Sequence, residues 1–261
     1  MVLVNMFDIS ELEEVISKFK SIYKDDFIFS KNRSVSDSVE NAIPKINPND
    51  FKKGKFKNEL KKIAKQKNIV NIFSSILGNN IRVSKFLDLR FNFSKIKSIG
   101  NTGWHQDVET LFSHYKDELG YDFITMWIAL TKATEKNSME ILPYSHLKKK
   151  VYDTSYEFQN AELEEIVPKY KNCKTYKFSC NPGDVFFLHP YVLHRTISDG
   201  ETFNRLSIDI RYLNLNFKNK VTVIAPKLRL KRLYKHLRRL AVILLDFLGI
   251  KKIIKQIVKH K

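Results

Sequence analysis

The sequence predicts an α+β protein with its helices first and a β-sheet sandwich or barrel at its centre. Apolar residues recur at helical spacing in the first third of the chain, and from Ile81 onward the spacing changes to two, which is typical of strands. Helices followed by a train of strands characterise the α+β class. With 43% apolar residues in 261, the chain can bury a core, so a wholly disordered protein is excluded.

Two helices are expected before the strands. The first covers 10–23, begins at Asp8 or Ser10 as N-cap, and carries an apolar stripe of Leu12, Val15, Ile16, Phe19 and Ile22. The second covers 55–77 and ends at Gly78. Lysines crowd its first half, where they form either a solvated helix face, the more common case, or a binding patch.

Six strands are expected after the helices, separated by Gly, Pro, Asn and Asp breaks, at 81–93, 122–131, 138–142, 174–179, 184–189 and 205–215. The apolar run within 184–189 is too hydrophobic to lie at the surface. The polar segment 30–50, which contains two prolines, is expected to be a loop.

The cysteines and the apolar segments indicate the cellular compartment in which the protein is expected. Cys173 and Cys180 are too few for a disulfide framework or a four-ligand zinc site, so we expect two reduced thiols; one bridge between them is the alternative. The first residues lack a basic segment followed by a long apolar one, and the longest apolar run, 240–250, is too short to cross a bilayer. A cytoplasmic protein is therefore expected.

A metal-binding pattern appears at Trp104-His105-Gln106-Asp107, directly after a Gly/Asn/Thr turn. His105 and Asp107 are spaced i, i+2, so in an extended chain both side chains leave the same face. An imidazole and a carboxylate are two thirds of a facial ligand set for ferrous iron, which a second imidazole completes. Alone, the spacing is common by chance and more typical of a hydrogen-bonded surface pair.

A second segment supplies the missing groups. The turn 181–184 (Asn-Pro-Gly-Asp) leads into the apolar strand, and His189 and His194 follow, either of which offers the second imidazole. Arg205 comes eleven residues after His194, on the next strand. A planar guanidinium can fork onto the far carboxylate of a dicarboxylic acid whose other end chelates iron. That geometry suits 2-oxoglutarate.

Three stretches together resemble the phytanoyl-CoA dioxygenase family of iron(II)- and 2-oxoglutarate-dependent oxygenases. They are Trp104 to Asp107, then Trp127-Ile128-Ala129-Leu130 through Pro143-Tyr144-Ser145-His146, then Gly183-Asp184-Val185-Phe186-Phe187 through His194 to Arg205. In the family's order they span about 81–215. The resemblance implies a double-stranded β-helix (jelly-roll, cupin-like) core, with iron at one end of the barrel and the N-terminal helices packed on it.

The resemblance also implies roles for individual residues. His105, Asp107 and His194 would bind Fe(II). The spacing to Arg205 selects His194 over His189, which then lies behind the ligands or in the core. Arg205 would bind the distal carboxylate of 2-oxoglutarate, and the Thr196 hydroxyl would assist Arg205. Trp127 would line the pocket or serve as a core aromatic, and Arg90 or Lys95 could reach the cosubstrate or an anionic substrate. His114 and His146 would be structural histidines.

Two departures from the family pattern bear on the substrate. Tyr144 stands where the family commonly has Gly, and 138–140 (Ser-Met-Glu) replaces Gly-Cys-Leu; neither touches the implied ligands. A carboxylate at Asp107 fills the position that Gly or Ala would leave open for a halide, which favours hydroxylation with O2 over halogenation. The alternatives are a non-catalytic basic jelly-roll binding protein, which would not need all four site residues, and an oxidative demethylase of nucleic acid.

The net charge of +18 lies mostly at one end of the chain. Residues 227–261 carry +11 and the preceding 226 carry +7, so we expect an oxygenase domain at 1–226 and a basic amphipathic helical tail at 227–261. Leucines spaced three and four apart form one face of the tail. Such a helix suits an anionic membrane surface, which indicates a peripheral enzyme on the inner face acting on a small or lipid-linked substrate, for example a glycan or glycolipid intermediate. A helix packed on the domain or in a homo-oligomer is the alternative. Nucleic acid is disfavoured because no aromatic stacking platform accompanies the charge.

Overall fold

The computed structural model describes residues 2–3, 6–23, 56–92, 102–108, 118, 120–147, 151–152, 170, 172–197 and 204–218. All of them lie within the compact unit Met1–Lys218. The loop expected at 30–50, the tail expected at 227–261, Lys95 and His114 lie outside the described residues.

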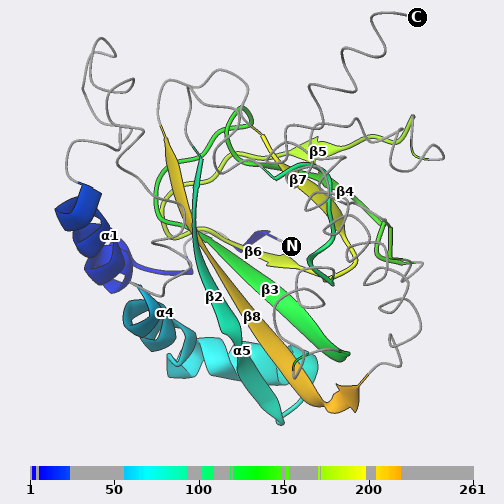
Figure 1. Cartoon of the computed structure of the whole chain (residues 1–261), viewed down its shortest axis with the longest axis horizontal. Helices are drawn as coiled ribbons and strands as arrows, with labels where there is room; N and C mark the ends of the chain where they lie inside the picture. Colours follow the sequence, from blue (N-terminus) through cyan, green and yellow to red (C-terminus); the bar gives the residue numbers. More distant parts are fainter. Residues whose placement is uncertain are drawn as a thin grey trace, which may run out of the picture. The chain divides into compact units, whose positions relative to one another are not determined.

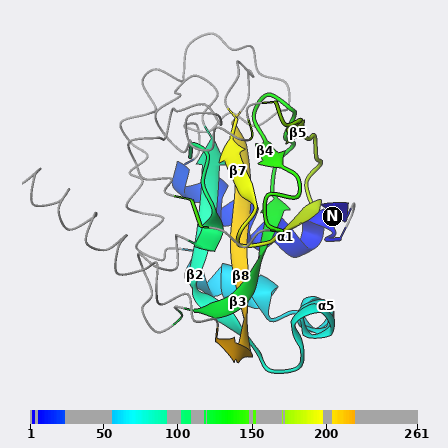
Figure 2. The same cartoon turned by 90° about the vertical axis from the view of Figure 1, so that its right-hand side faces the viewer.

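Two antiparallel sheets form the centre of this unit (Figure 1). The larger has the strand order β1 (Val2–Leu3), β6 (Val185–Leu188), β3 (Tyr121–Ala129), β8 (Arg205–Lys218) and β2 (Ile81–Asn92). The smaller has the order β5 (Tyr176–Lys177), β4 (Met139–Leu142) and β7 (Leu193–Thr196). Figures 1 and 2 show the smaller sheet toward the end of the larger one where β2 finishes and β8 begins. The expected combination of helices with an antiparallel sheet is confirmed.

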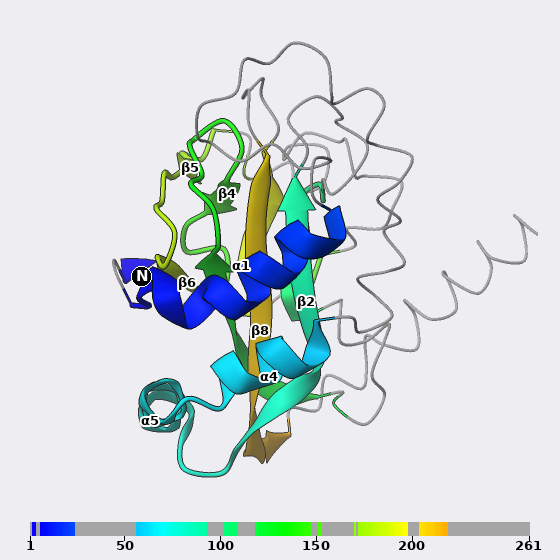
Figure 3. The ribbon, with the colours of Figure 1, turned by 90° about the vertical axis from the view of Figure 1, so that its left-hand side faces the viewer.

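Helices cover one face of the larger sheet (Figure 3). Within the described residues they are α1 (Ile9–Tyr23), α4 (Lys57–Ala64) and α5 (Lys67–Leu77). The first begins after Asp8, whose backbone N–H donates to the Glu11 carboxylate at 2.8 Å, one half of a capping box. The last ends at Gly78, where φ is 91°. Both of these helix ends agree with the sequence prediction.

The prediction of one continuous helix over 55–77 is wrong. Gln66 has φ −58° and ψ 134°, an extended conformation at which an α-helix cannot continue. Both halves pack against β2 and β8, and α4 also packs against α1. In α5, Phe73 stacks on Tyr212 of β8 with ring centroids 3.8 Å apart. The break lets the apolar faces of both helices join the same core with the sheet.

β8 separates two interiors of opposite character. Its even-numbered residues from Leu206 to Tyr212 belong to the apolar core under the helices. Its odd-numbered residues Arg205, Ser207, Asp209 and Arg211 leave the opposite face, as the two-residue period of a strand requires, and they are buried as well. Charged side chains are rarely buried without partners, so this second face marks a functional region.

The remaining strands and the cysteines agree closely with the sequence. All six expected strands are present, and β1 and β7 are additional ones that the apolar spacing does not predict. Cys173 is exposed, Cys180 is buried, and both are free. Among the described residues, no helix has the length and apolar content needed to span a membrane.

The turn after β4 is anchored from the inside. The Ser145 hydroxyl donates to the Leu142 carbonyl at 2.7 Å and accepts the backbone N–H of Leu193, on β7, at 2.9 Å. Beside it Tyr144 has a φ of 61° and a side chain that is 76% exposed. Left-handed backbone is unfavourable for a bulky residue, so this turn is strained at its solvent side.

Candidate active site

An isolated antiparallel bridge brings His105 next to His194 of β7. The backbone N–H of His105 donates to the His194 carbonyl at 2.9 Å, and that of His194 donates to the His105 carbonyl at 3.1 Å. This pair of bonds sets the residues directly opposite each other, with ring centroids 4.1 Å apart. The Trp-His-Gln-Asp segment is thereby attached to the strand that carries His194.

Both rings are oriented for metal binding. Nδ1 of His105 lies 2.8 Å from the Gly103 carbonyl, and Nδ1 of His194 lies 3.0 Å from the Val192 carbonyl. A carbonyl can only accept, so each Nδ1 carries the hydrogen and each Nε2 keeps a free lone pair. Burial, reinforced by the neighbouring His194, lowers the pKa of His105 to about 3, so its ring is neutral near pH 7.

Asp107 completes a group of three. One ligand atom each from His105, Asp107 and His194 lies within 4.8 Å of the others. Burial alone would raise the pKa of the Asp107 carboxyl, but Arg211 and the two histidines hold it well below its usual range. The group therefore offers two imidazoles and one carboxylate.

A pocket opens at this group. It is lined by every residue implied above for iron or cosubstrate, apart from Lys95, together with four others: Arg90, Thr102, His105, Asp107, Trp127, Met139, Leu188, His194, Thr196, Arg205 and Asp209. β2, β3 and β8 of the larger sheet and β4 and β7 of the smaller one all contribute to the lining.

Arg205 is a buried cation that lines this pocket, and no carboxylate of the described residues forms an ion pair with it. It is 2% exposed, its Nη1 donates to the Ser138 carbonyl at 3.2 Å, and its Nε has no hydrogen-bond partner among the described residues. Burial lowers the pKa of Arg205 to about 10, which leaves it charged near neutral pH. A buried guanidinium with an unsatisfied donor fits an anionic ligand such as a carboxylate.

Trp127 and Thr196 line the pocket together with this cation. The Arg205 guanidinium sits 5.5 Å from the centroid of the Trp127 ring, within the range of a cation–π contact. Trp127 also packs edge-on against Phe186 at 5.8 Å, so it is both a pocket wall and a core aromatic. Thr196 is on β7, two residues beyond His194, and its backbone N–H donates to the Thr102 carbonyl at 2.8 Å.

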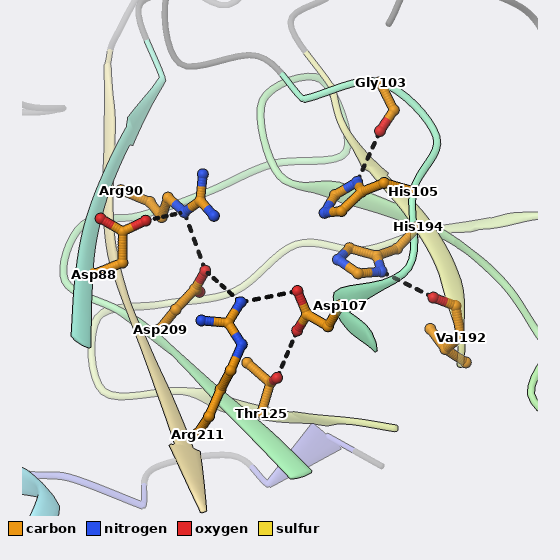
Figure 4. A network of polar contacts seen from close by, with 10 residues as sticks. All are labelled: Asp88, Arg90, Gly103, His105, Asp107, Thr125, Val192, His194, Asp209 and Arg211. Carbon is orange, nitrogen blue, oxygen red and sulfur yellow. Dashed lines mark hydrogen bonds and ion pairs between the residues drawn. The ribbon is translucent and has the colours of Figure 1, made fainter. Parts of the chain in front are cut away.

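A row of alternating charges runs along the pocket face of β2 and β8 (Figure 4). Nε of Arg90 donates to Asp209 at 3.1 Å and forms an ion pair with Asp88 at 2.9 Å. Asp209 lies 4.0 Å from Arg211, which pairs with Asp107 at 2.8 Å. Burial would lower the pKa of Arg90, but Asp88 and Asp209 hold it above its usual value. Asp209, in contrast, has a raised pKa because burial outweighs its cationic neighbours.

The other described histidines lie outside this group. His189 does not line the pocket; its ring is 5.0 Å from that of His146 and 5.7 Å from that of Tyr191. Its Nδ1 accepts the backbone N–H of Tyr191 at 3.3 Å. The structure therefore groups His194, rather than His189, with His105 and Asp107.

Sequence reasoning missed four polar residues of the site: Thr102, Thr125, Asp209 and Arg211. A signal was available for two of them. Arg205, Asp209 and Arg211 occupy odd-numbered positions of a strand whose even-numbered residues are apolar, and this alternation indicates a buried polar face.

Comparison with models of known protein families shows to which family the chain belongs. The model of the family described as "Phytanoyl-CoA dioxygenase (PhyH)" matches residues 4–198. The chain belongs to this family. It is therefore an iron- and 2-oxoglutarate-dependent enzyme, as the resemblance implied. A search of curated proteins gives no significant match.

Solved structures share the fold of this chain. The epimerase SnoN, in complex with Fe3+, alpha ketoglutarate and nogalamycin RO, has a TM-score of 0.54 at 18% identity, over 86% of this chain and 83% of SnoN. EctD from S. alaskensis, with 2-oxoglutarate and 5-hydroxyectoine, has 0.53 at 16% identity, over 83% and 72%. HygX from Streptomyces hygroscopicus, with nickel and 2-oxoglutarate bound, has 0.52 at 15% identity, over 84% of each chain. At these identities the likeness concerns the fold alone.

Proposed function

We propose that this enzyme is a hydroxylase that binds Fe(II) through His105, Asp107 and His194. The observation that carries the proposal is the convergence of three ligand atoms within 4.8 Å at a pocket lined also by a buried arginine, which pairs with no carboxylate in the described part of the chain. The donor set fits iron because two imidazoles and one carboxylate form a facial triad with positions left open. We also assign the two antiparallel sheets to the jelly-roll core of the family, which the shared fold supports.

The residues around Arg205 bind and orient the cosubstrate in this proposal. Arg205 pairs with the distal carboxylate of 2-oxoglutarate, and its unsatisfied Nε supplies a donor for that contact. Thr196 adds a hydroxyl, and Trp127 covers the guanidinium and keeps water from it. Arg90, held through Nε by two aspartates, presents its remaining nitrogens to the cosubstrate or to an anionic substrate.

Iron with 2-oxoglutarate and O2 supplies the oxidising chemistry when bound. The protein's share is to keep His105 and His194 in the tautomer that presents Nε2, to keep Asp107 ionised, and to close the cosubstrate end of the pocket with apolar groups. Asp107 occupies the position that a halide would need, so hydroxylation is the proposed outcome.

Succinate formation tests the chemistry. We expect purified protein to release succinate from 2-oxoglutarate only with Fe(II) present, and a panel of small and lipid-linked anionic metabolites to reveal the substrate by stimulating that release. His105→Ala and Asp107→Ala should abolish it. A wild-type chain that binds no divalent metal would refute the assignment.

The tail at 227–261 gives the proposed location. Its charge of +11 and its leucine spacing support a peripheral enzyme at the cytoplasmic membrane face, with the oxygenase domain at 1–226. Full-length protein should sediment with anionic liposomes, and a chain truncated after Ala225 should not. Equal sedimentation of both, or of neither, would remove the membrane from the proposal and leave a packed or oligomeric helix.

A further inference from the structure

The carboxylate of Asp107 is held at both oxygens before any metal is considered. Nη2 of Arg211 donates to Oδ1 at 2.8 Å, and the Thr125 hydroxyl donates to Oδ2. Arg211 is 0% exposed and stands on the pocket face of β8, directly across from Thr125 of β3. Figure 4 shows both donors approaching Asp107 from the side away from the histidines.

Stabilisation of the fold alone does not account for where this ion pair is placed. Elsewhere in the chain, the fully buried Glu118 pairs at 3.5 Å with Arg82, whose side chain is 41% exposed. Glu118 also accepts the Ser84 hydroxyl and the Lys85 backbone N–H, and it does not line the pocket at the His-Asp-His group. Arg211 instead pairs with one of the three groups that converge on the metal position.

The two donors restrict what Asp107 can do. Each carboxylate oxygen has two lone pairs, and here one on each oxygen is already used. Rotation about the Cβ–Cγ bond would break both hydrogen bonds, so the plane of the carboxylate is fixed. A metal on the histidine side then meets one oxygen rather than both.

We propose that Arg211 is a positioning residue of the metal centre, which holds Asp107 as a one-oxygen ligand. The inference rests on the proposed function, because it takes His105, Asp107 and His194 as the metal ligands. Asp209 lies 4.0 Å from the same nitrogen of Arg211 and is itself bound by Arg90, so the guanidinium is oriented from two sides.

Charge repulsion and positioning by Arg211 predict opposite changes in metal affinity when Arg211 is removed, so the direction of the change tests the proposal. Arg211 is a cation close to the position of a divalent cation, and charge repulsion by itself would weaken metal binding. If repulsion dominated, removing Arg211 would tighten binding. Removal of groups that orient metal ligands typically weakens binding by about 10- to 100-fold, and positioning therefore predicts a loss of that size.

Cobalt titration of the full-length protein separates the two effects. Co(II) alone is added to metal-free wild type, Arg211→Met and Arg211→Lys, with the visible absorption of bound Co(II) as the report on coordination number. Arg82→Met is the matched control, because it breaks an ion pair in the same sheet that does not touch the pocket. Melting temperatures of the metal-free proteins establish that each variant is folded.

We expect Arg211→Met to weaken Co(II) binding about 10- to 100-fold and to change the spectrum as Asp107 turns toward two-oxygen binding. Arg211→Lys should recover part of the affinity, since an ammonium offers one donor without the planar fork. Arg82→Met should melt at a lower temperature with wild-type affinity and spectrum.

Unchanged or tighter Co(II) binding by Arg211→Met, with the wild-type spectrum, would overturn the proposal. Where that variant does not fold, the Lys variant decides, because wild-type affinity and spectrum there would show that the guanidinium is not needed. A wild-type protein that binds no Co(II) would instead refute the proposed function.

Discussion

The two faces of β8 are equally buried and differ in almost everything else. Toward the helices the strand presents Leu206, Ile208, Ile210 and Tyr212, which pack without polar contacts apart from the Tyr212 hydroxyl, a donor to the Ala64 carbonyl. Toward the pocket it presents Arg205, Ser207, Asp209 and Arg211. One strand thus carries stability on one side and chemistry on the other. Substitutions one residue apart should therefore have separable consequences.

The largest effect is expected on the pocket side, from the loss of a metal ligand. His194→Ala should weaken divalent metal binding by more than the roughly 100-fold typical of outer groups, and should abolish succinate formation. The metal-free protein should still unfold cooperatively, which calorimetry can check. His189→Ala, five residues away and outside the pocket, is the control and should keep metal binding.

On the helix side of β8, a substitution is expected to lower the stability of the fold and leave metal affinity unchanged. Ile208→Ala leaves a cavity beneath the helices and should lower the free energy of unfolding by about 2–5 kcal/mol in urea titrations of metal-free protein. Metal affinity of the folded fraction should not change. A parallel loss of affinity would mean that the two faces of β8 are coupled and that the contrast between them fails.

A smaller effect is expected from the cosubstrate arginine. Arg205→Met removes charge-assisted hydrogen bonds worth about 1.5–3 kcal/mol, so binding of 2-oxoglutarate to the Mn(II)-loaded protein should weaken about 10- to 100-fold. Metal binding in the absence of 2-oxoglutarate should stay at the wild-type level. Titration calorimetry measures both, and equal losses in the two would contradict a role confined to the cosubstrate.

The smallest effect is expected from trimming the helix side by one methylene. Ile210→Val should cost about 0.5–1.5 kcal/mol of unfolding free energy and leave both ligand affinities as they are. A change in 2-oxoglutarate binding from so small a substitution would show that packing under the helices sets the spacing of the pocket residues.

Local patterns predicted much of this arrangement. The change of period at Ile81 and the apolar run ending at Leu188 locate strands because side-chain direction repeats every two residues along a strand. The motif around His105 and the distance from His194 to Arg205 identify the residues that the pocket brings together. These features depend on neighbours in the sequence or on fixed spacing.

Other features depend on contacts that no local pattern contains. The break at Gln66 lies between two helices that both pack on β2 and β8, of which α4 also packs against α1. β7 is a four-residue strand with only one aliphatic side chain, and it forms because β4 pairs with it. The partner of Arg211 lies 104 residues away, so its pairing with Asp107 is visible only in the folded chain.

The strained turn at Tyr144 affects which further mutations the protein can accept. Ser145 ties that turn to Leu193, the residue before His194, so the register of β7 is maintained partly by a turn whose solvent side is unfavourable. Substitution of the exposed Tyr144 by Gly or Asn would release roughly 1–2 kcal/mol of strain, while the tie through Ser145 stays in place. A stabilising substitution at position 144 could therefore offset destabilising mutations elsewhere in the protein without moving a metal ligand.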